Sequence, residues 1–324
     1  MTESDTNPHL LVTVAVATFN RAALLRRALQ SVLSQDYENL EVIVGDNASE
    51  DETYLVRQAL GGDRRVRWIR HETNRGALSN FEILLQEAKG HYFMWLADDD
   101  YLSPGYISRC ATRLSEPDAP RNVVGRAVLR RDGAFVRAEC FRYIDTDPRK
   151  RVLLFYRTVR ANSLFYSMST TDQAREVLPF MPGVSCDWVH VARHVYLGRA
   201  EYLDDVTLTV SLHERDSGEK VARGWHRQAY KMFFLASDSA RDVCTHPVYA
   251  GLRPSQRRVF AMRCAAITFR RRSARTDLFC AVAMTLKRIL PERPYQWLQG
   301  TWRRRRPERL RFSANLDIHA PSGE

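Results

Sequence analysis

The first hundred residues alternate apolar runs with amphipathic segments, and this alternation limits the fold more than any other feature of the chain. The opening run, residues 10–19, is rich in Val and Ala and is typical of a strand buried on both faces. The pattern predicts strands at 10–19, 40–45, 66–70 and 92–97, and helices at 20–34, 49–60 and 77–88. Such an alternation predicts an α/β fold with a doubly wound, mostly parallel, Rossmann-like sheet and helices on both faces.

Ligands of such a sheet bind beyond the carboxyl ends of its strands, and four polar loops of this chain fall there. These loops are residues 17–21, 46–51, 74–76 and 98–100. The last loop places three consecutive carboxylates after a buried strand, an arrangement that is costly unless a cation neutralises them. The triplet therefore predicts a hard divalent ion, Mg²⁺ or Mn²⁺, and a ligand that carries phosphate groups. For the triplet alone, a solvated turn before a helix is the alternative.

In this order, the four loops resemble those of the family 2 glycosyltransferases, which have the GT-A fold; the resemblance covers about the first third of the chain. It implies a nucleotide-sugar site made of Thr18, Asn20, Arg21, Asp46, Asn47, Ser49, Arg75, Asp98 and Asp99. In the family pattern Asp46 accepts a hydrogen bond from the base, Asp51 holds the loop and Arg75 approaches the diphosphate. From the residues alone, Asp46 and Ser49 could instead cap the second helix, and Arg75 could lie in a turn.

The resemblance also implies a divalent metal cofactor, Mn²⁺ or Mg²⁺, with Asp99, Asp100 and His213 as candidate ligands. His213 ends a predicted pair of strands at residues 202–213, although a lone His at a strand end is most often structural or exposed to solvent. The family often has Asp where Ala97 and Asn47 stand in this chain. Which carboxylate of the triplet binds the ion therefore stays open.

Asp187 is the candidate catalytic base. Apolar residues recur at helical spacing from residue 187 to 196, which places Asp187 at a helix N-terminus directly after a loop. The family has its catalytic Asp at the start of a similar helix, and the resemblance implies inversion at the anomeric carbon. This chain departs from the pattern at Cys186, where the family usually has an acidic residue. The alternative is that Asp187 only caps the helix.

The resemblance divides the globular part of the chain into two halves. Residues 1–120 are predicted to bind the nucleotide-sugar, and residues 121–215 to bind the acceptor. Within the second half, residues 123–136 predict a hairpin with an Asp-Gly turn, and residues 161–179 predict a helical stretch. The chain has no Gly-x-Gly-x-x-Gly motif after its first strand and no P-loop motif, so dinucleotide binding and P-loop hydrolysis are not supported.

The last third, residues 216–324, is predicted to be a basic amphipathic helical extension. It has apolar stripes at residues 256–272 and 278–290, and then Trp297, Trp302 and four Arg at 303–306. With the net charge of +11, this pattern favours an anionic membrane surface, and packing on the catalytic domain is the alternative. We find no signal-peptide pattern, no Cys-x-x-Cys and no apolar stretch of ~20 residues, and predict a cytoplasmic protein, peripheral on the inner face of the membrane.

Together these features predict a metal-dependent, inverting glycosyltransferase. We expect it to use a UDP- or dTDP-sugar donor and a saccharide acceptor, lipid-linked, in surface polysaccharide synthesis. A catalytically silent scaffold that binds sugar nucleotides is one alternative. A nucleic-acid-binding protein is a weaker one, because the arginines cluster in the tail without a base-reading module and the acidic loops would repel phosphate.

Overall fold

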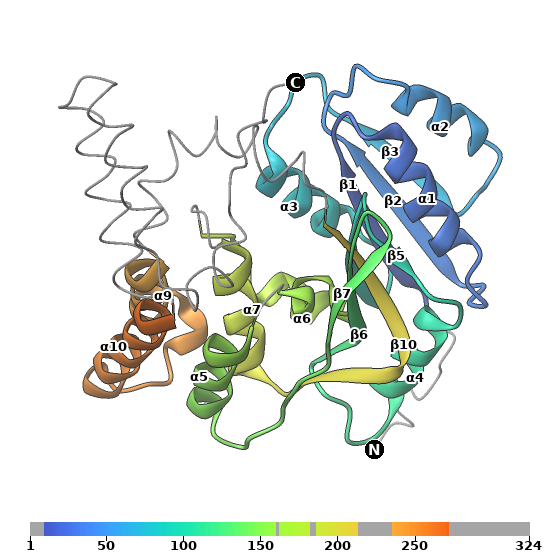
Figure 1. The fold of residues 1–324 in the computed structure, drawn as a ribbon. Coiled ribbons are helices and arrows are strands. Elements are labelled where there is room, and N and C mark those ends of the chain that lie inside the picture. Colours follow the sequence, from blue (N-terminus) through green and yellow to red (C-terminus); the bar gives the residue numbers. More distant parts are fainter. Residues whose placement is uncertain (1–9, 160–161, 182–185, 213–234, 272–324) are drawn as a thin grey trace, which may run out of the picture.

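The computed structural model describes residues 10–159, 162–181, 186–212 and 235–271. These residues form two β-sheets with helices around them, which confirms the predicted α/β fold class (Figure 1). The first sheet contains the predicted alternation of strands and helices. The second sheet is built mainly from strands later in the sequence, and a bridge between Val123 and Met168 connects it to the edge of the first.

The first sheet has the strand order β3-β2-β1-β4-β9. Its strands are β1 (Val12–Thr18), β2 (Leu40–Asp46), β3 (Val66–Arg70), β4 (Tyr92–Ala97) and β9 (Ser169–Thr170). The connecting helices are α1 (Ala22–Leu33), α2 (Thr53–Ala59) and α3 (Ala77–Glu87). Strands β1 to β4 are parallel, with α1 and α2 on one face and α3 on the other (Figure 1). The chain changes direction across the sheet between β1 and β4, and such a switch point is where ligands bind.

Burial explains why the first strand is almost entirely apolar. β1 lies at the centre of the sheet, paired with β2 on one side and β4 on the other. Val14, Ala15 and Val16 are fully buried, because successive side chains point to opposite faces and helices cover both. The stripe of α1 that packs on this sheet consists of Leu25, Ala28, Leu29 and Val32, as its helical spacing predicts.

The second sheet has the order β5-β10-β6-β7, and β8 also pairs with β10. Its strands are β5 (Tyr101–Leu102), β6 (Asn122–Arg131), β7 (Ala134–Glu139), β8 (Arg142–Tyr143) and β10 (Ala200–Leu212). The predicted hairpin is confirmed, and Asp132 and Gly133 at its turn both have positive φ. The predicted strand pair at 202–213 is wrong, because β10 is one long strand with a register shift between Leu203 and Thr207. An irregularity of this kind absorbs extra residues without ending the strand.

The helical prediction for residues 161–179 is also wrong in part. This stretch contains a short 3₁₀ helix, η1 (Ser163–Tyr166), then β9, then the short helix α6 (Thr171–Glu176). Ser169 and Thr170 pair with the edge of β4, and Thr170 then caps α6 through its side chain. Hydroxyl residues readily end one element and begin another in this way.

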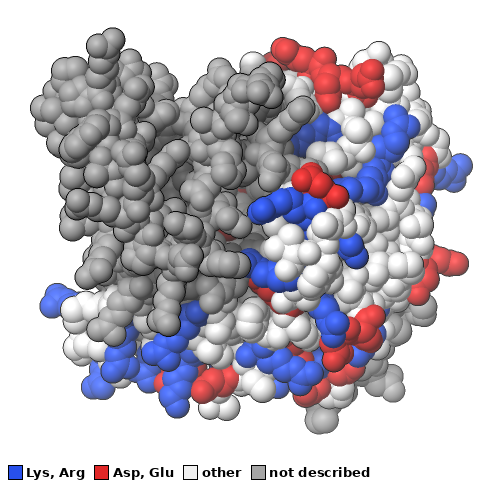
Figure 2. Space-filling model, in the orientation of Figure 1, with Lys and Arg blue, Asp and Glu red and all other residues white. Residues whose placement is uncertain are grey.

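The remaining helices surround the second sheet and extend from it. They are α4 (Tyr106–Ser115), α5 (Pro148–Thr158), α7 (Cys186–Leu197), α9 (Leu235–Thr245), η3 (Pro247–Tyr249) and α10 (Pro254–Arg271). A buried ion pair with an N···O distance of 2.7 Å joins Arg193 of α7 to Asp242 of α9. Among the described helices, none is both long and apolar enough to cross a bilayer. Figure 2 shows mostly Lys and Arg over α5 and α10, at the lower left of the molecule.

Candidate functional site

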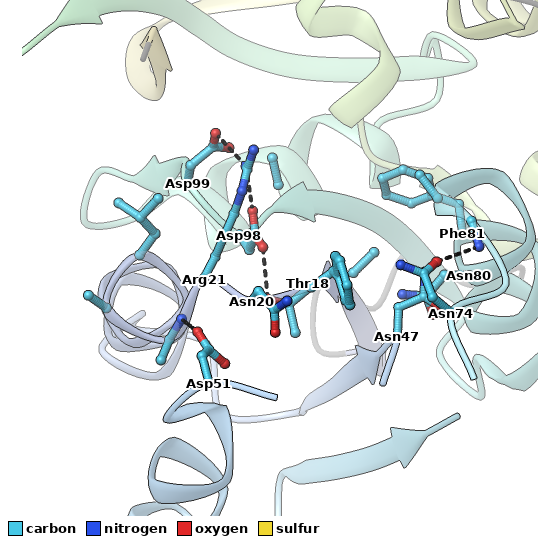
Figure 3. A pocket seen from close by; sticks show the side chains of 18 of the residues that line it. Thr18, Asn20, Arg21, Asn47, Asp51, Asn74, Asn80, Phe81, Asp98 and Asp99 are labelled. Carbon is cyan, nitrogen blue, oxygen red and sulfur yellow. Dashed lines mark hydrogen bonds and ion pairs between the residues drawn. The ribbon is translucent and has the colours of Figure 1, made fainter. Parts of the chain in front are cut away.

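A cavity of about 1020 Å³ opens at the carboxyl ends of β1 and β4. Its polar lining includes Thr18, Asn20, Arg21, Asn47, Asp51, Asn74, Asn80, Asp98 and Asp99. Figure 3 shows Arg21, Asp98 and Asp99 together on one side, and Asn47, Asn74 and Asn80 on the other. The cavity lies at the switch point of the first sheet, so the fold brings six of the nine predicted nucleotide-sugar-binding residues to one place.

One guanidinium nitrogen connects two carboxylates of the acidic triplet. Arg21 Nη1 donates to Asp98 Oδ1 at 3.1 Å and to Asp99 Oδ2 at 3.0 Å. The other oxygen of Asp98 accepts a hydrogen bond from Thr18 Oγ1 at 2.8 Å. Burial raises the pKa of Asp98 to about 6, although Arg21 and Thr18 both act to lower it. The two carboxylates are thus held around a cation on the wall of the cavity.

Asp100 is not among the residues that line the cavity. It is 2% exposed, and its Oδ1 accepts a hydrogen bond from the backbone N–H of Ser211 on β10 at 2.8 Å. Burial raises the pKa of this carboxyl group well above its usual range. Arg27 strengthens the same junction by donating to the carbonyl oxygen of Asp99 and, at 2.9 Å, to Ser211 Oγ. The third carboxylate therefore fastens β10 to the triplet, and its role as a metal ligand stays a prediction.

Asp98 and Asp99 form a donor set that suits a divalent ion. In the described part of the chain, no group of three or more His, Cys, Asp and Glu side chains is arranged to hold a metal. Mg²⁺ and Mn²⁺ do not need such a cage in nucleotide sites, because one or two carboxylates suffice when water and phosphate oxygens complete the shell. The two carboxylates already bind a shared cation, which is the requirement such a site must meet. His213 lies outside the described residues.

The loops after β1 and β2 are joined by hydrogen bonds that fix the floor of the cavity. The N–H of Asn20 donates to Ser49 Oγ at 2.9 Å, and Asn20 Oδ1 accepts from the N–H of Glu50 at 2.7 Å. Asp51 Oδ2 accepts from the first N–H of α1, that of Ala22, at 2.9 Å. Asp51 therefore holds this loop by capping the start of α1, where backbone N–H groups lack helical partners.

Asp46 lies in a smaller neighbouring hollow of about 320 Å³, which shares Asp51 with the main cavity. Its buried carboxylate accepts from the N–H of Ser49 at 2.8 Å and pairs with Arg70. Asp46 therefore closes a turn at the end of β2, and an arginine lies beside it. The alternative in which Asp46 and Ser49 cap the second helix is wrong, because α2 has Glu52 at its N-cap and no side-chain cap hydrogen bond. Arg70 was not predicted as a site residue, although a cation at the carboxyl end of the third strand was visible in the sequence.

Three asparagines shape the opposite wall of the cavity. Asn47 Oδ1 accepts from the backbone N–H of Arg75 at 2.8 Å, and Asn47 Nδ2 donates to Asn74 Oδ1 at 2.8 Å. Asn80 Nδ2 donates to the carbonyl oxygen of Gly45 at 2.8 Å. Arg75 thus contributes its backbone to this wall, while its side chain is exposed beside the lining. Asn74 and Asn80 were missed because isolated amides between elements give no distinctive pattern.

Asp187 lies in the first turn of α7, at the predicted helix N-terminus, and the buried Asn162 holds it. Asn162 Nδ2 donates to Asp187 Oδ2 at 2.9 Å, and Asn162 itself has positive φ. Tyr166 of η1 lines the cavity; burial raises its pKa well above the usual range, and the charges of Asp100, Asp99 and Asp187 act in the same direction. The Tyr166 hydroxyl is therefore within electrostatic reach of both Asp187 and the triplet. Asp187 itself does not line the described cavity.

The sequence of the cavity region matches a known family. Residues 13–170 match the family model Glycosyl transferase family 2. GalNAc(5)-diNAcBac-PP-undecaprenol beta-1,3-glucosyltransferase of Campylobacter jejuni is 34% identical over 124 residues, which are 38% of this chain and 40% of that protein. WcaA of Escherichia coli, which is named for colanic acid biosynthesis, is 33% identical over 30% of this chain and 36% of its own length. The chain therefore spans less than half the length of these two relatives.

Solved structures share the architecture at low sequence identity. The S. aureus TarS 1-349 fragment has a TM-score of 0.59 and 17% identity, covering 80% of this chain and 72% of that one. The mannosyltransferase PcManGT from Pyrobaculum calidifontis, solved with GDP-Man and Mn²⁺, has a TM-score of 0.54 and 18% identity, covering 92% and 81%. The fold is thus that of the GT-A glycosyltransferases. Within this class, residues 13–170 form a family 2 glycosyltransferase domain.

Proposed function

We propose that this chain transfers a sugar from a nucleotide-diphospho-sugar to a hydroxyl group of a saccharide acceptor, with inversion at the anomeric carbon. One observation carries the proposal. Asp98, Asp99 and Arg21 meet in a large cavity at the switch point, and Tyr166 in the lining of that cavity is acted on by the charges of both the triplet and the candidate base Asp187. A family 2 glycosyltransferase domain at residues 13–170 supports this activity.

The chain's own residues divide the chemistry between them. As the acceptor oxygen bonds to the anomeric carbon, Asp187 takes the hydroxyl proton, and Asn162 keeps that carboxylate oriented. The bond from the anomeric carbon to the diphosphate oxygen breaks, and the electron pair stays on the diphosphate. Arg21 adds positive charge near this leaving group, while the cavity aligns donor and acceptor. Held by Asp98 and Asp99, Mn²⁺ or Mg²⁺ would supply further neutralisation of that charge.

The hollow around Asp46 and Arg70 is proposed to bind the base of the nucleotide. The Asp46 carboxylate supplies a hydrogen-bond acceptor and the Arg70 guanidinium supplies donors. The imide N–H and the adjacent carbonyl oxygen of uracil or thymine offer the complementary pattern, which supports UDP or dTDP as the nucleotide. The solved structures of similar fold do not decide between the bases, because TarS was solved with UDP-GlcNAc and PcManGT with GDP-Man.

We predict that UDP and dTDP bind roughly 10- to 100-fold more tightly than ADP and GDP, since an unpaired buried polar group costs about 1–3 kcal/mol. The change Asp46→Ala should remove this preference, measured by calorimetry with the four nucleotides. Asp63→Ala is the matched control, because Asp63 also pairs with an arginine, Arg65, but away from both hollows. Equal binding of the four nucleotides would reject the role of Asp46, whereas tighter binding of GDP would keep the role and reject a pyrimidine.

The acceptor is proposed to be a lipid-linked saccharide in surface polysaccharide synthesis. The name of the C. jejuni relative states an undecaprenol-linked acceptor, and that of the E. coli relative states colanic acid biosynthesis. A lipid-linked acceptor places the enzyme at a membrane, on the cytoplasmic face where nucleotide-sugars are made. Helix α10 fits such a surface, because exposed Val259 and Met262 lie beside exposed Arg258 and Arg263 on one side of the helix. The rest of the predicted tail, residues 216–234 and 272–324, lies outside the described residues.

Arg258→Gln with Arg263→Gln should weaken binding to liposomes of anionic lipid by roughly 10- to 30-fold at low salt, since each basic residue near such a surface adds about 1 kcal/mol. The difference should shrink in high salt, which screens the attraction. Sedimentation with liposomes measures both effects. Arg26→Gln with Arg64→Gln is the control, because these exposed arginines lie on α1 and beyond α2. Equal loss in both double variants would mean that net charge, and not the α10 surface, drives binding.

One assay separates the proposal from its alternatives. Purified full-length protein is given UDP-, dTDP- and GDP-sugars with an undecaprenyl-diphosphate-linked saccharide, with and without Mn²⁺. Transfer that needs both donor and Mn²⁺ is the expected result. If the protein binds the donor but neither transfers the sugar to any acceptor nor hydrolyses the donor, the silent scaffold is favoured. Binding of nucleic acid without binding of any sugar nucleotide would favour the third alternative.

A further inference from the structure

Arg21 occupies the position that a divalent ion would need. Its Nη1 contacts one oxygen of Asp98 and one of Asp99 at nearly equal distances, 3.1 and 3.0 Å. Asp98 is almost fully buried and Asp99 is only 17% exposed, so neither carboxylate is well solvated. Thr18 already holds the other oxygen of Asp98, so a metal that bound the remaining oxygen would lie close to the guanidinium. Like charges at such a distance repel strongly, so the metal and the guanidinium compete for the two carboxylates.

The Arg21 side chain has an alternative partner if a diphosphate enters the cavity. It lies on the cavity wall and is 32% exposed, whereas the carboxylates that it contacts are fixed by neighbours such as Thr18. Guanidinium groups bind phosphate oxygens as well as carboxylates, and phosphate carries the higher charge. Movement of this one side chain would release the carboxylates and cover a diphosphate.

We infer that Arg21 is a built-in counter-ion: it neutralises Asp98 and Asp99 in the protein alone and yields them to a metal when a nucleotide diphosphate provides its new partner. This inference rests on the proposed function, because it assumes a metal–diphosphate donor. It makes metal and donor binding cooperative. A metal that binds alone breaks the ion pairs of Arg21, and no new contact replaces them. When a diphosphate binds with the metal, the released Arg21 contacts the phosphates, and this offsets the loss.

The test measures Mn²⁺ binding to full-length protein by electron paramagnetic resonance of free Mn²⁺, without nucleotide and with saturating UDP. Without nucleotide, Arg21→Ala should bind Mn²⁺ roughly 10- to 100-fold more tightly than wild type. The reason is that the metal no longer has to break the charged hydrogen bonds by which Arg21 stabilises the metal-free protein. With UDP, the advantage of the variant should disappear. The Mn²⁺ affinity of Arg21→Lys without nucleotide should lie between those of wild type and Arg21→Ala, because Lys keeps the positive charge but lacks the planar guanidinium.

Arg27→Gln is the matched control. It removes a positive charge from the same neighbourhood, but the described hydrogen bonds of its guanidinium go to the carbonyl oxygen of Asp99 and the hydroxyl of Ser211. It should leave nucleotide-free Mn²⁺ affinity within a few-fold of wild type. Tight Mn²⁺ binding by wild type without nucleotide, or no gain in either Arg21 variant, would overturn the inference. None of these measurements requires turnover, so absence of transferase activity would count against the proposed function alone.

Discussion

Replacing Asp187 with Asn should lower kcat by roughly 10² to 10⁴ while leaving donor affinity almost unchanged. The reason is specific to the proton transfer. An Asn side chain keeps the shape of Asp and an oxygen that can accept the Asn162 hydrogen bond, and it can still lie at the start of α7. It cannot take a proton from the acceptor hydroxyl. The measurement is steady-state transfer with donor affinity determined separately by calorimetry.

Asp172→Asn provides the control for this experiment. Asp172 lies in the first turn of α6, as Asp187 lies in the first turn of α7, but its side chain is 97% exposed. Both variants lose the same small interaction with a helix N-terminus, so their melting temperatures should change by similar amounts. If Asp187→Asn keeps wild-type turnover and differs only in stability, Asp187 is a cap and not a base. Asp205 would not replace it, because Asp205 pairs with Arg109 away from the cavity lining.

Local patterns were sufficient to predict the first sheet and its ligand-binding edge. Strands such as β1 are buried on both faces, so their sequence is nearly all apolar. The apolar stripe of α1 indicates which side of that helix packs on the sheet. Parallel strands then bring their carboxyl ends to one edge, and this explains why Thr18, Arg21 and Asp98 were predicted together. The short element β9 and the single strand β10 were missed, because pairing with distant strands decides both.

Contacts between distant residues account for most of what the sequence did not reveal about the site. Asp100 and its partner Ser211 are separated by 111 positions, and no periodicity links them, so the hydrogen bond between them could not be predicted from the sequence. Tyr166 comes from a four-residue 3₁₀ helix that local propensity did not distinguish from an α-helix. Arg21 was predicted to line the nucleotide pocket, but only the folded chain shows that its guanidinium binds two carboxylates at once.

The last prediction distinguishes two carboxylates of the triplet, Asp99 and Asp100, by replacing each with Asn. Asp99→Asn should lower kcat/KM by roughly 10² to 10³, because it removes charge from the proposed metal–diphosphate site, and nucleotide binding should lose its sensitivity to EDTA. Asp100→Asn should keep most activity, since its amide oxygen can still accept the Ser211 hydrogen bond that joins β10 to the triplet. Calorimetry with UDP and Mn²⁺, with and without EDTA, measures both variants.

Asp100→Ala tests the same assignment through stability. It leaves the partly buried N–H of Ser211 without its acceptor, which costs about 1–3 kcal/mol, so this variant should melt several degrees below Asp100→Asn. The order of effects is therefore opposite for the two positions: charge matters at Asp99 and hydrogen bonding matters at Asp100. Full loss of EDTA-sensitive binding in Asp100→Asn, with an unchanged melting temperature, would instead make Asp100 a metal ligand. Unchanged nucleotide binding in EDTA for wild type would remove the metal from the site altogether.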